Sequence, residues 1–129
     1  MQEPKYKILV IDDEPGYRKF YNKILTKTFS AEVIEACNPK DAFDYLKGND
    51  NPDLILLDMQ MPVMDGHTAL RKIRGNPKTK EIPVIAATAL NTPELVAGLL
   101  KLNISDYIVK PTNSQIAIQK IKKVLDNIE

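Results

Sequence analysis

Residues 53 to 62 read Asp-Leu-Ile-Leu-Leu-Asp-Met-Gln-Met-Pro, and this stretch predicts the fold of the whole chain. Four apolar residues, 54 to 57, run without a polar break, and prolines at 52 and 62 bound them. A short apolar run between turn signals is typical of a strand buried on both faces, as in the centre of a parallel sheet. The run ends on a carboxylate, Asp58. We therefore place Asp58 at the carboxyl edge of the sheet, where open α/β sheets bind their ligands.

Short apolar runs and helical patterns alternate along the rest of the chain. Besides the central strand at 53–58, strands are expected at 6–11, 32–36, 82–87 and 106–109. Helices are expected from Pro15 to Phe29, from Asn38-Pro39 to Gly48, from Asp65-Gly66 to the break at Gly75-Asn76-Pro77, from Thr92-Pro93 to Leu102, and from Asn113 or Ser114 onward. The starts of these helices follow the usual preference for Asn, Asp or Thr caps and for proline in the first turn.

This alternation predicts an α/β fold. Five parallel strands joined by right-handed crossover helices give a doubly wound sheet, (βα)5, with helices on both faces. The sequence does not fix the strand order, and we expect 2-1-3-4-5, one of the two common orders of such sheets. With 129 residues, the chain is expected to form one domain over 1–129, without an output domain.

Composition argues against several other classes of protein. The formal net charge is +1, so no strong field favours nucleic acid or an anionic membrane. The single cysteine, Cys37, excludes an intramolecular disulfide and a multi-cysteine zinc site, and we expect it to be a small buried side chain. No apolar segment approaches the roughly 18 residues of a membrane span, and the N-terminus has no signal-peptide core. We therefore expect a soluble, cytoplasmic protein with no membrane insertion and no direct contact with nucleic acid.

Side chains of complementary chemistry follow the strands. In the expected order the first and third strands are neighbours, so Asp12, Asp13 and Asp58 converge at one edge, joined by Thr88 and Lys110. Three close carboxylates repel one another, and a hard divalent cation such as Mg²⁺ relieves that repulsion. A carboxylate, Mg²⁺, a lysine and a hydroxyl together form a phosphoryl-transfer site in which one carboxylate is free to act as a nucleophile.

Several other polar residues are expected to have structural roles. Asp53 and Asp106 begin their strands and so lie at the opposite edge of the sheet, and Asp65 is expected to cap a helix. His67 is expected to be exposed, and the lysines at 120, 122 and 123 are expected to form a solvated helix face.

The motifs together resemble one family. The sequences Asp12-Asp13, Asp58 with Met61-Pro62 and Asp65-Gly66, Thr88-Ala89, and Tyr107 with Lys110-Pro111 resemble the receiver domain of two-component response regulators, chemotaxis regulators included. The resemblance covers essentially the whole chain. Each motif alone is weak, but their occurrence in order, most of them at strand ends, is very specific. The chain departs from the family pattern at Thr112, where phenylalanine is frequent, and at Asn103, where glycine is usual.

The resemblance implies a role for each site residue. Asp58 is the phosphoacceptor, and it receives its phosphoryl group from the phosphohistidine of a histidine kinase or phosphotransfer protein. Mg²⁺ is held by the side chains of Asp12, Asp13 and Asp58 and by the backbone carbonyl of Gln60. Lys110 pairs with the phosphoryl group. Thr88 hydrogen-bonds that group and moves inward, and Tyr107 follows as the switch aromatic. The Lys110-Pro111 bond resembles one that is cis in the family.

The resemblance also implies partners. The expected ones are the phosphodonor protein, a downstream protein target or output domain, and a second copy of the chain in a homodimer. The switching surface lies on the fourth helix, fifth strand and fifth helix. Apolar residues beyond a single core stripe mark a partner or dimer face there, namely Leu95, Leu99, Ile116 and Ile118. Such a protein takes part in its own phosphorylation and slow autodephosphorylation, but it is a signalling phosphoacceptor and not an enzyme.

The sequence argues against three other functions. A pseudo-receiver keeps the fold and binds partners without phosphorylation, but its usual sign is loss of an acidic, threonine or lysine residue, and none is lost here. A haloacid-dehalogenase-like phosphatase requires a second acid two residues after the nucleophile, where this chain has Gln60. A flavin carrier requires a phosphate-cradling loop after the first strand, and we find no glycine-rich or hydroxyl-rich sequence there.

Overall fold

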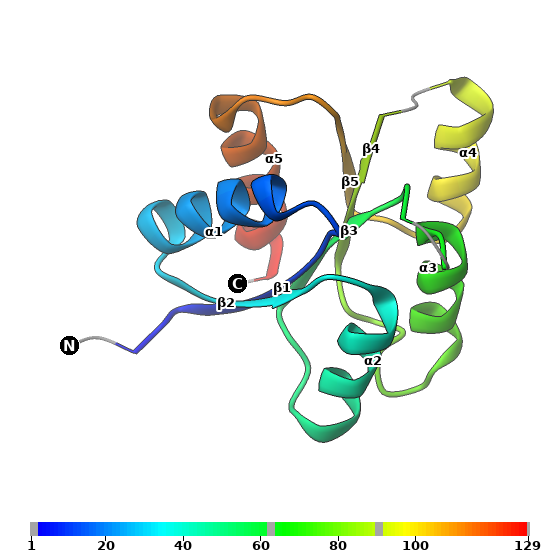
Figure 1. The fold of residues 1–129 in the computed structure, drawn as a ribbon, viewed down its shortest axis with the longest axis horizontal. Helices are drawn as coiled ribbons and strands as arrows, with labels where there is room; N and C mark the ends of the chain where they lie inside the picture. Colours follow the sequence, from blue (N-terminus) through cyan, green and yellow to red (C-terminus); the bar gives the residue numbers. More distant parts are fainter. Residues whose placement is uncertain (1–2, 62–63, 90–91, 129) are drawn as a thin grey trace.

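A computed structural model of the chain describes residues 3–61, 64–89 and 92–128. Strands and helices alternate along it (Figure 1). The elements, in order, are β1 (Tyr6–Ile11), α1 (Pro15–Phe29), β2 (Ala31–Ala36), α2 (Pro39–Gly48), β3 (Leu54–Asp58), α3 (Gly66–Gly75), β4 (Val84–Thr88), α4 (Pro93–Lys101), β5 (Asp106–Val109) and α5 (Ser114–Ile128). Pro62, which bounds the central run and belongs to the Met61-Pro62 motif, lies outside the described residues.

The strands form one parallel sheet in the order β2-β1-β3-β4-β5, as expected. Helices α1 and α5 cover one face, and α2, α3 and α4 cover the other (Figure 1). The predicted α/β class, strand order and two-sided helix packing are therefore confirmed.

The central strand β3 supplies both layers of the core. All of its residues are buried, as the unbroken apolar run predicts. Because side chains alternate along a strand, Leu54 and Leu56 pack with α1 and α5, whereas Ile55 and Leu57 pack with α2, α3 and α4. The central strand is thereby fixed in register by apolar packing on both faces.

Strand β4 begins later than expected, at Val84 and not at Ile82. Pro83 has no N–H and cannot donate to the sheet, although its carbonyl accepts a bond from the N–H of Ile55 at 2.9 Å. Ile82 belongs instead to the preceding turn, where its N–H donates to Thr79 O at 3.1 Å. Ile82 is nonetheless buried, which is why its apolar character misled the boundary.

The predicted helix caps are present. Asn38 Oδ1 accepts from the N–H of Asp41 at 2.8 Å, and Asp65 Oδ1 accepts from the N–H of Thr68 at 2.9 Å. Asn103 adopts the left-handed conformation, with φ of 58°, after the end of α4. These contacts are local in sequence, so local signals suffice to predict them.

Three expectations about single side chains are wrong. Cys37 is exposed and not buried, because it lies between β2 and the cap of α2, where its Sγ faces Asp41 Oδ2 at 3.4 Å. His67 is half-buried, since its ring lies against the α4 backbone at Gly98. Lys120 is also half-buried, with its Nζ over the ring of Tyr107, 4.6 Å from the centroid.

The α4–β5–α5 region also differs in detail from expectation. Leu99 is almost fully buried in the core beneath α2, α3 and α4, and Ile118 is half-buried against the core on the α1–α5 face, so neither is an exposed side chain. Ile116 is exposed, as expected, and so is Leu100. Within the part of the chain that the structure describes, none of the helices has the length and apolar character needed to cross a bilayer.

Candidate phosphoryl-transfer site

The register of the sheet brings the acidic strand ends together. Ile11 of β1 pairs with Leu57 of β3, so the next residues along each chain, Asp12 and Asp58, lie side by side. On the other side of β3, Thr88 ends β4 opposite Val109 of β5, and the N–H of Lys110 donates to Thr88 O at 2.8 Å. Parallel pairing therefore gathers residues that are up to 98 positions apart in the sequence.

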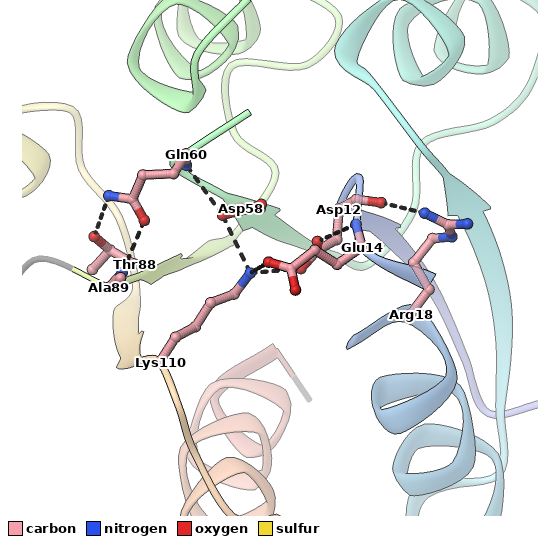
Figure 2. A network of polar contacts seen from close by, with 8 residues as sticks. All are labelled: Asp12, Glu14, Arg18, Asp58, Gln60, Thr88, Ala89 and Lys110. Carbon is pink, nitrogen blue, oxygen red and sulfur yellow. Dashed lines mark hydrogen bonds and ion pairs between the residues drawn. The ribbon is translucent and has the colours of Figure 1, made fainter. Parts of the chain in front are cut away.

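Lys110 links the two buried acids (Figure 2). Its Nζ lies 3.0 Å from Asp12 Oδ2 and 3.4 Å from Asp58 Oδ1, and it approaches the exposed Glu14 at 3.8 Å. Asp12 and Asp58 are only 1% and 2% exposed. Such buried carboxylates need a partner, and one ammonium shared between two of them compensates only part of their charge.

The two oxygens of Asp58 differ in their surroundings. Oδ1 accepts from the N–H of Gln60 at 3.1 Å and faces Lys110. Oδ2 is buried, and it has no hydrogen-bond partner among the described residues. Burial and the neighbouring charge of Asp12 raise the pKa of Asp58 to about 6, although the N–H of Gln60 and the ammonium of Lys110 lower it. Asp58 is thus a carboxylate with one oxygen free for a new bond.

The cation is held in its charged form. Burial lowers the pKa of Lys110, but the hydrogen bond to Asp12 and the charges of Asp12 and Asp58 outweigh burial and raise it overall. The Nζ also lies over the ring of Tyr17, 4.1 Å from its centroid. Lys110 is therefore a permanent positive charge at this edge of the sheet.

Four acids at the edge fit a divalent cation. Asp12, Asp13, Glu14 and Asp58 each offer one oxygen, and these oxygens all lie within 4.8 Å of one another. The unpartnered, buried Oδ2 of Asp58 also fits, because a cation would satisfy it. An all-oxygen donor set suits Mg²⁺. The assignment of the Gln60 carbonyl to this set stays a prediction.

The side chain of Gln60 bridges to the end of β4 (Figure 2). Its Nε2 donates to Thr88 Oγ1 at 3.0 Å, and its Oε1 accepts from the N–H of Ala89 at 2.9 Å. The amide thus engages a buried hydroxyl and a backbone N–H beside Asp58. The sequence did not predict these contacts with Thr88 and Ala89.

The loop after Asp58 is held close to α3 by a glycine. A Cβ built on Gly66 would lie 2.5 Å from Met59 Cα and 2.7 Å from Asp58 O. The N–H of Gly66 donates to Met59 O at 3.2 Å. Only glycine permits this approach of two backbone segments, so the Asp65-Gly66 motif both caps α3 and fixes the position of the Asp58 backbone.

Helix α1 contributes contacts that sequence reasoning missed. Arg18 Nη1 donates to the backbone carbonyl of Asp12 at 2.7 Å (Figure 2). Its Nε faces Glu35 of β2 at 3.4 Å. The ring of Tyr17 lies under the ammonium of Lys110. The available signal was their distance from Asp12-Asp13, about one helical turn into α1.

The other predicted residues divide as follows. Tyr107 is half-buried and packs against the core on the α2–α4 face, and the Lys110–Pro111 bond is cis, as the resemblance implies. Asp53 accepts from the N–H of Lys7 at 2.8 Å, and Asp106 pairs with Lys120 at 3.4 Å. These two acids begin or precede their strands and lie away from Asp58, as expected.

Comparisons with known proteins agree with this arrangement. Residues 8–122 match the response regulator receiver domain family. A chemotaxis protein CheY homolog of Campylobacter jejuni is 32% identical over 119 residues, which cover 92% of each chain.

Solved structures agree as well. The signal receiver domain of a signal transduction histidine kinase from Syntrophus aciditrophicus has a TM-score of 0.84 and 31% identity, covering 96% of this chain and 92% of that one. The Mn²⁺-bound form of the response regulator Rcp1 has a TM-score of 0.78 and 25% identity, covering 92% and 91%.

A family match over most of the chain, a parallel sheet in the order 2-1-3-4-5 and acids gathered at its carboxyl edge lead to one assignment. The chain belongs to the receiver domain family of two-component response regulators.

Proposed function

We propose that this receiver is phosphorylated on Asp58, from the phosphohistidine of a histidine kinase or a phosphotransfer protein. The observation that carries the proposal is the state of Asp58: a buried carboxylate with Oδ1 held by two donors and Oδ2 without a partner among the described residues. Such an oxygen has free lone pairs and little mobility, as a nucleophile requires.

The reaction that we propose moves a phosphoryl group from nitrogen to oxygen. A carboxylate oxygen of Asp58 forms a bond to phosphorus while the phosphorus–nitrogen bond of the donor breaks, and the electron pair and a proton go to the imidazole. Lys110 neutralises negative charge on the phosphoryl oxygens, since its Nζ lies 3.4 Å from Asp58. Thr88 Oγ1 hydrogen-bonds one of those oxygens.

We propose that Asp12, Asp13, the side chain of Asp58 and the carbonyl of Gln60 hold Mg²⁺. The mutual approach of the acidic oxygens within 4.8 Å supports this, as does the Mn²⁺ named for the related Rcp1 structure. The ion, when bound, supplies positive charge to the phosphoryl oxygens and relieves repulsion among the acids.

Incubation with Mg²⁺ and a small acyl-phosphate donor, followed by intact mass, tests the proposal. The wild type should gain one phosphoryl group, should gain none under chelation, and should lose it slowly on standing. Asp58→Asn should gain none. Asp53→Asn is the matched control, because this acid lies away from Asp58 and hydrogen-bonds a backbone N–H, and it should be phosphorylated normally.

One outcome favours a different function. An unchanged mass in folded wild type, with Mg²⁺ and donor present, would point to a pseudo-receiver that binds partners without phosphorylation. The intact set of Asp12, Asp13, Asp58, Thr88 and Lys110 argues for the phosphorylated form.

We also propose that phosphorylation alters the surface formed by α4, β5 and α5, in the cytoplasm, where receivers usually act. Thr88 and Tyr107 are the proposed coupling residues; Tyr107 is half-buried and lies on β5, next to the strand that Thr88 ends. Receiver domains interact with histidine kinases and with output or target proteins. Exposed Leu100 and Ile116 give this surface apolar contacts for a downstream protein, with a second copy of the chain as the other occupant.

A further inference from the structure

The ammonium of Lys110 has an aromatic neighbour as well as acidic ones. Its Nζ lies over the ring of Tyr17, 4.1 Å from the centroid, while Asp12 and Asp58 lie at 3.0 and 3.4 Å. The Lys110 side chain is only 8% exposed. A cation within about 6 Å of the face of an aromatic ring is attracted by the negative potential of that face, and more so where water is excluded.

The ring of Tyr17 is held in place by two others. It stacks on Tyr21 with centroids 6.3 Å apart and an interplanar angle of 30°, and it meets Phe20 edge-on at 6.3 Å and 87°. Phe20 and Tyr21 contact each other at 5.2 Å, and Tyr21 is 1% exposed. These two contacts restrain the orientation of the Tyr17 ring.

Some contacts of Lys110 change when the site binds Mg²⁺ and a phosphoryl group, and others do not. Asp12 and Asp58 are the acids that we assign to the cation and the phosphoryl group, so both change partners when the site is loaded. Glu14 is farther away, at 3.8 Å, and its side chain is 60% exposed. The Tyr17 ring takes no part in metal binding or in bond formation, so its contact with the ammonium can persist throughout.

Resting on the proposed function, we propose that Tyr17 is a positioning residue for Lys110. Its ring keeps the ammonium beside Asp58 when Asp12 binds Mg²⁺. Lys110 is then already in the rotamer that contacts the incoming phosphoryl group. If the ring only filled space, lowering the electron density on its face would not change the phosphorylation rate. If the ring attracts the ammonium, the same change should slow phosphorylation.

The test is a fluorination series in the full chain. Tyr17 is replaced by phenylalanine and then by mono-, di- and trifluorophenylalanine, which lowers the negative potential of the ring face with little change in volume. The measurements are the phosphorylation rate with a small acyl phosphate and the dissociation constant of beryllofluoride in the presence of Mg²⁺. Phe20 receives the same series as the matched control, because its ring lies in the same cluster and no contact between it and Lys110 is seen.

We expect Tyr17→Phe to stay within about twofold of wild type, because both rings attract cations. Increasing fluorination at position 17 should lower the phosphorylation rate and raise the dissociation constant of beryllofluoride stepwise, each by about three- to tenfold in total. The same series at position 20 should leave both unchanged. A flat series at position 17 in a protein that is phosphorylated normally would overturn the proposal and leave the function of Asp58 intact.

A second readout does not depend on phosphorylation. The ring current of Tyr17 should shift the ε-methylene protons of Lys110 upfield in NMR spectra; Tyr17→Phe should keep this shift and Tyr17→Leu should remove it. If wild type accepts no phosphoryl group, the function proposed for Asp58 fails, and these spectra still decide whether the ring holds Lys110. A Lys110 signal unaffected by Tyr17→Leu would overturn the positioning role.

Discussion

Asp58 is a buried charge whose burial is needed for chemistry and costs stability. Its side chain is 1% exposed and shares the ammonium of Lys110 with Asp12. An isolated buried carboxylate would be protonated, and the partial compensation by Lys110 leaves the pKa of Asp58 at about 6. The residue that makes the site reactive therefore opposes folding at neutral pH in the absence of a cation.

This conflict predicts a pH-dependent stability. The pKa of Asp58 is about 6 in the folded protein and near 3.8 when unfolded, so the folded state binds more protons between those values. The contribution of Asp58 to stability should therefore be most favourable below pH 4, fall as pH rises to 6, and level off above. Asp58→Asn lacks this loss and should be more stable than wild type at pH 7, by about 1–3 kcal/mol.

Denaturant unfolding of both proteins from pH 4 to 8, with a chelator present, measures the difference. The stability advantage of Asp58→Asn should shrink towards pH 4. Asp50→Asn provides the control, since it removes an exposed acid outside the buried edge of the sheet. A pH-independent difference for Asp58→Asn would mean that Asp58 titrates as an ordinary exposed acid.

At the scale of elements, the junction between β3 and α3 decides where Asp58 lies. Gly66 begins α3 directly against the backbone of Asp58 and Met59. Gly66→Ala places a methyl group 2.5 Å from Met59 Cα, so the loop must shift, because backbone atoms cannot rotate away. We expect a loss of about 1–3 kcal/mol in stability and slower phosphorylation.

Gly98→Ala in α4 is the matched control. A Cβ there meets nothing nearer than His67 Cε1, at 4.0 Å, and alanine favours a helix interior by about 0.5–1 kcal/mol over glycine. Thermal melts and phosphorylation rates of the two variants test the prediction. Equal effects at both positions would show that the β3–α3 loop relaxes freely.

Strand β4 is the element that we expect to carry the switch. Its last residue, Thr88, is 3% exposed, and its Oγ1 accepts a hydrogen bond from the Gln60 amide. Thr88→Ala should still accept the phosphoryl group, because Asp58 and Lys110 remain. It should lose the phosphorylation-dependent NMR shifts in α4, β5 and α5, whereas Thr112→Ala, beyond the cis Lys110–Pro111 bond, should keep them. Persistence of these shifts in Thr88→Ala would place the coupling elsewhere.

For the whole molecule, the acidic edge links cation binding to folding. Without metal, Asp12, Asp13 and Asp58 repel one another and Lys110 offsets only part of the charge. Asp13 is half-buried, so solvent screens its share of the repulsion. Asp13→Asn should stabilise the metal-free fold by about 1 kcal/mol after that discount.

With added Mg²⁺, wild type should become more stable than Asp13→Asn. Because the ion binds the native state, wild type should gain about 1.4 kcal/mol for each tenfold excess of Mg²⁺ over its Kd, and Asp13→Asn should gain little. Denaturant melts with and without millimolar Mg²⁺ decide this. A metal-free Asp13→Asn less stable than wild type would mean that Asp13 is held by structural hydrogen bonds, and the metal assignment would move to other acids such as Glu14.

The sequence by itself determined the elements and the residues at their ends. An unbroken apolar run predicts a doubly buried strand, and Asn38 and Asp65 predict helix starts, because these signals act within a few residues. Once the strands were parallel, Asp12, Asp58, Thr88 and Lys110 had to share one edge. The strand order is contained in no local signal, and we expected 2-1-3-4-5 because it is a common order of such sheets.

Only the tertiary structure decided which contacts the long side chains make. Arg74 donates to the carbonyls of Leu102, Lys80, Ile82 and Asn103, and thereby joins α3 to the turns that flank β4 and β5. The placement of Leu99 inside and Leu100 outside depends on how α4 is rotated against the sheet, which helical spacing leaves open. The ring of Tyr17 over Lys110 likewise joins residues 93 positions apart. Such contacts follow from packing across elements, and no window of sequence contains both partners.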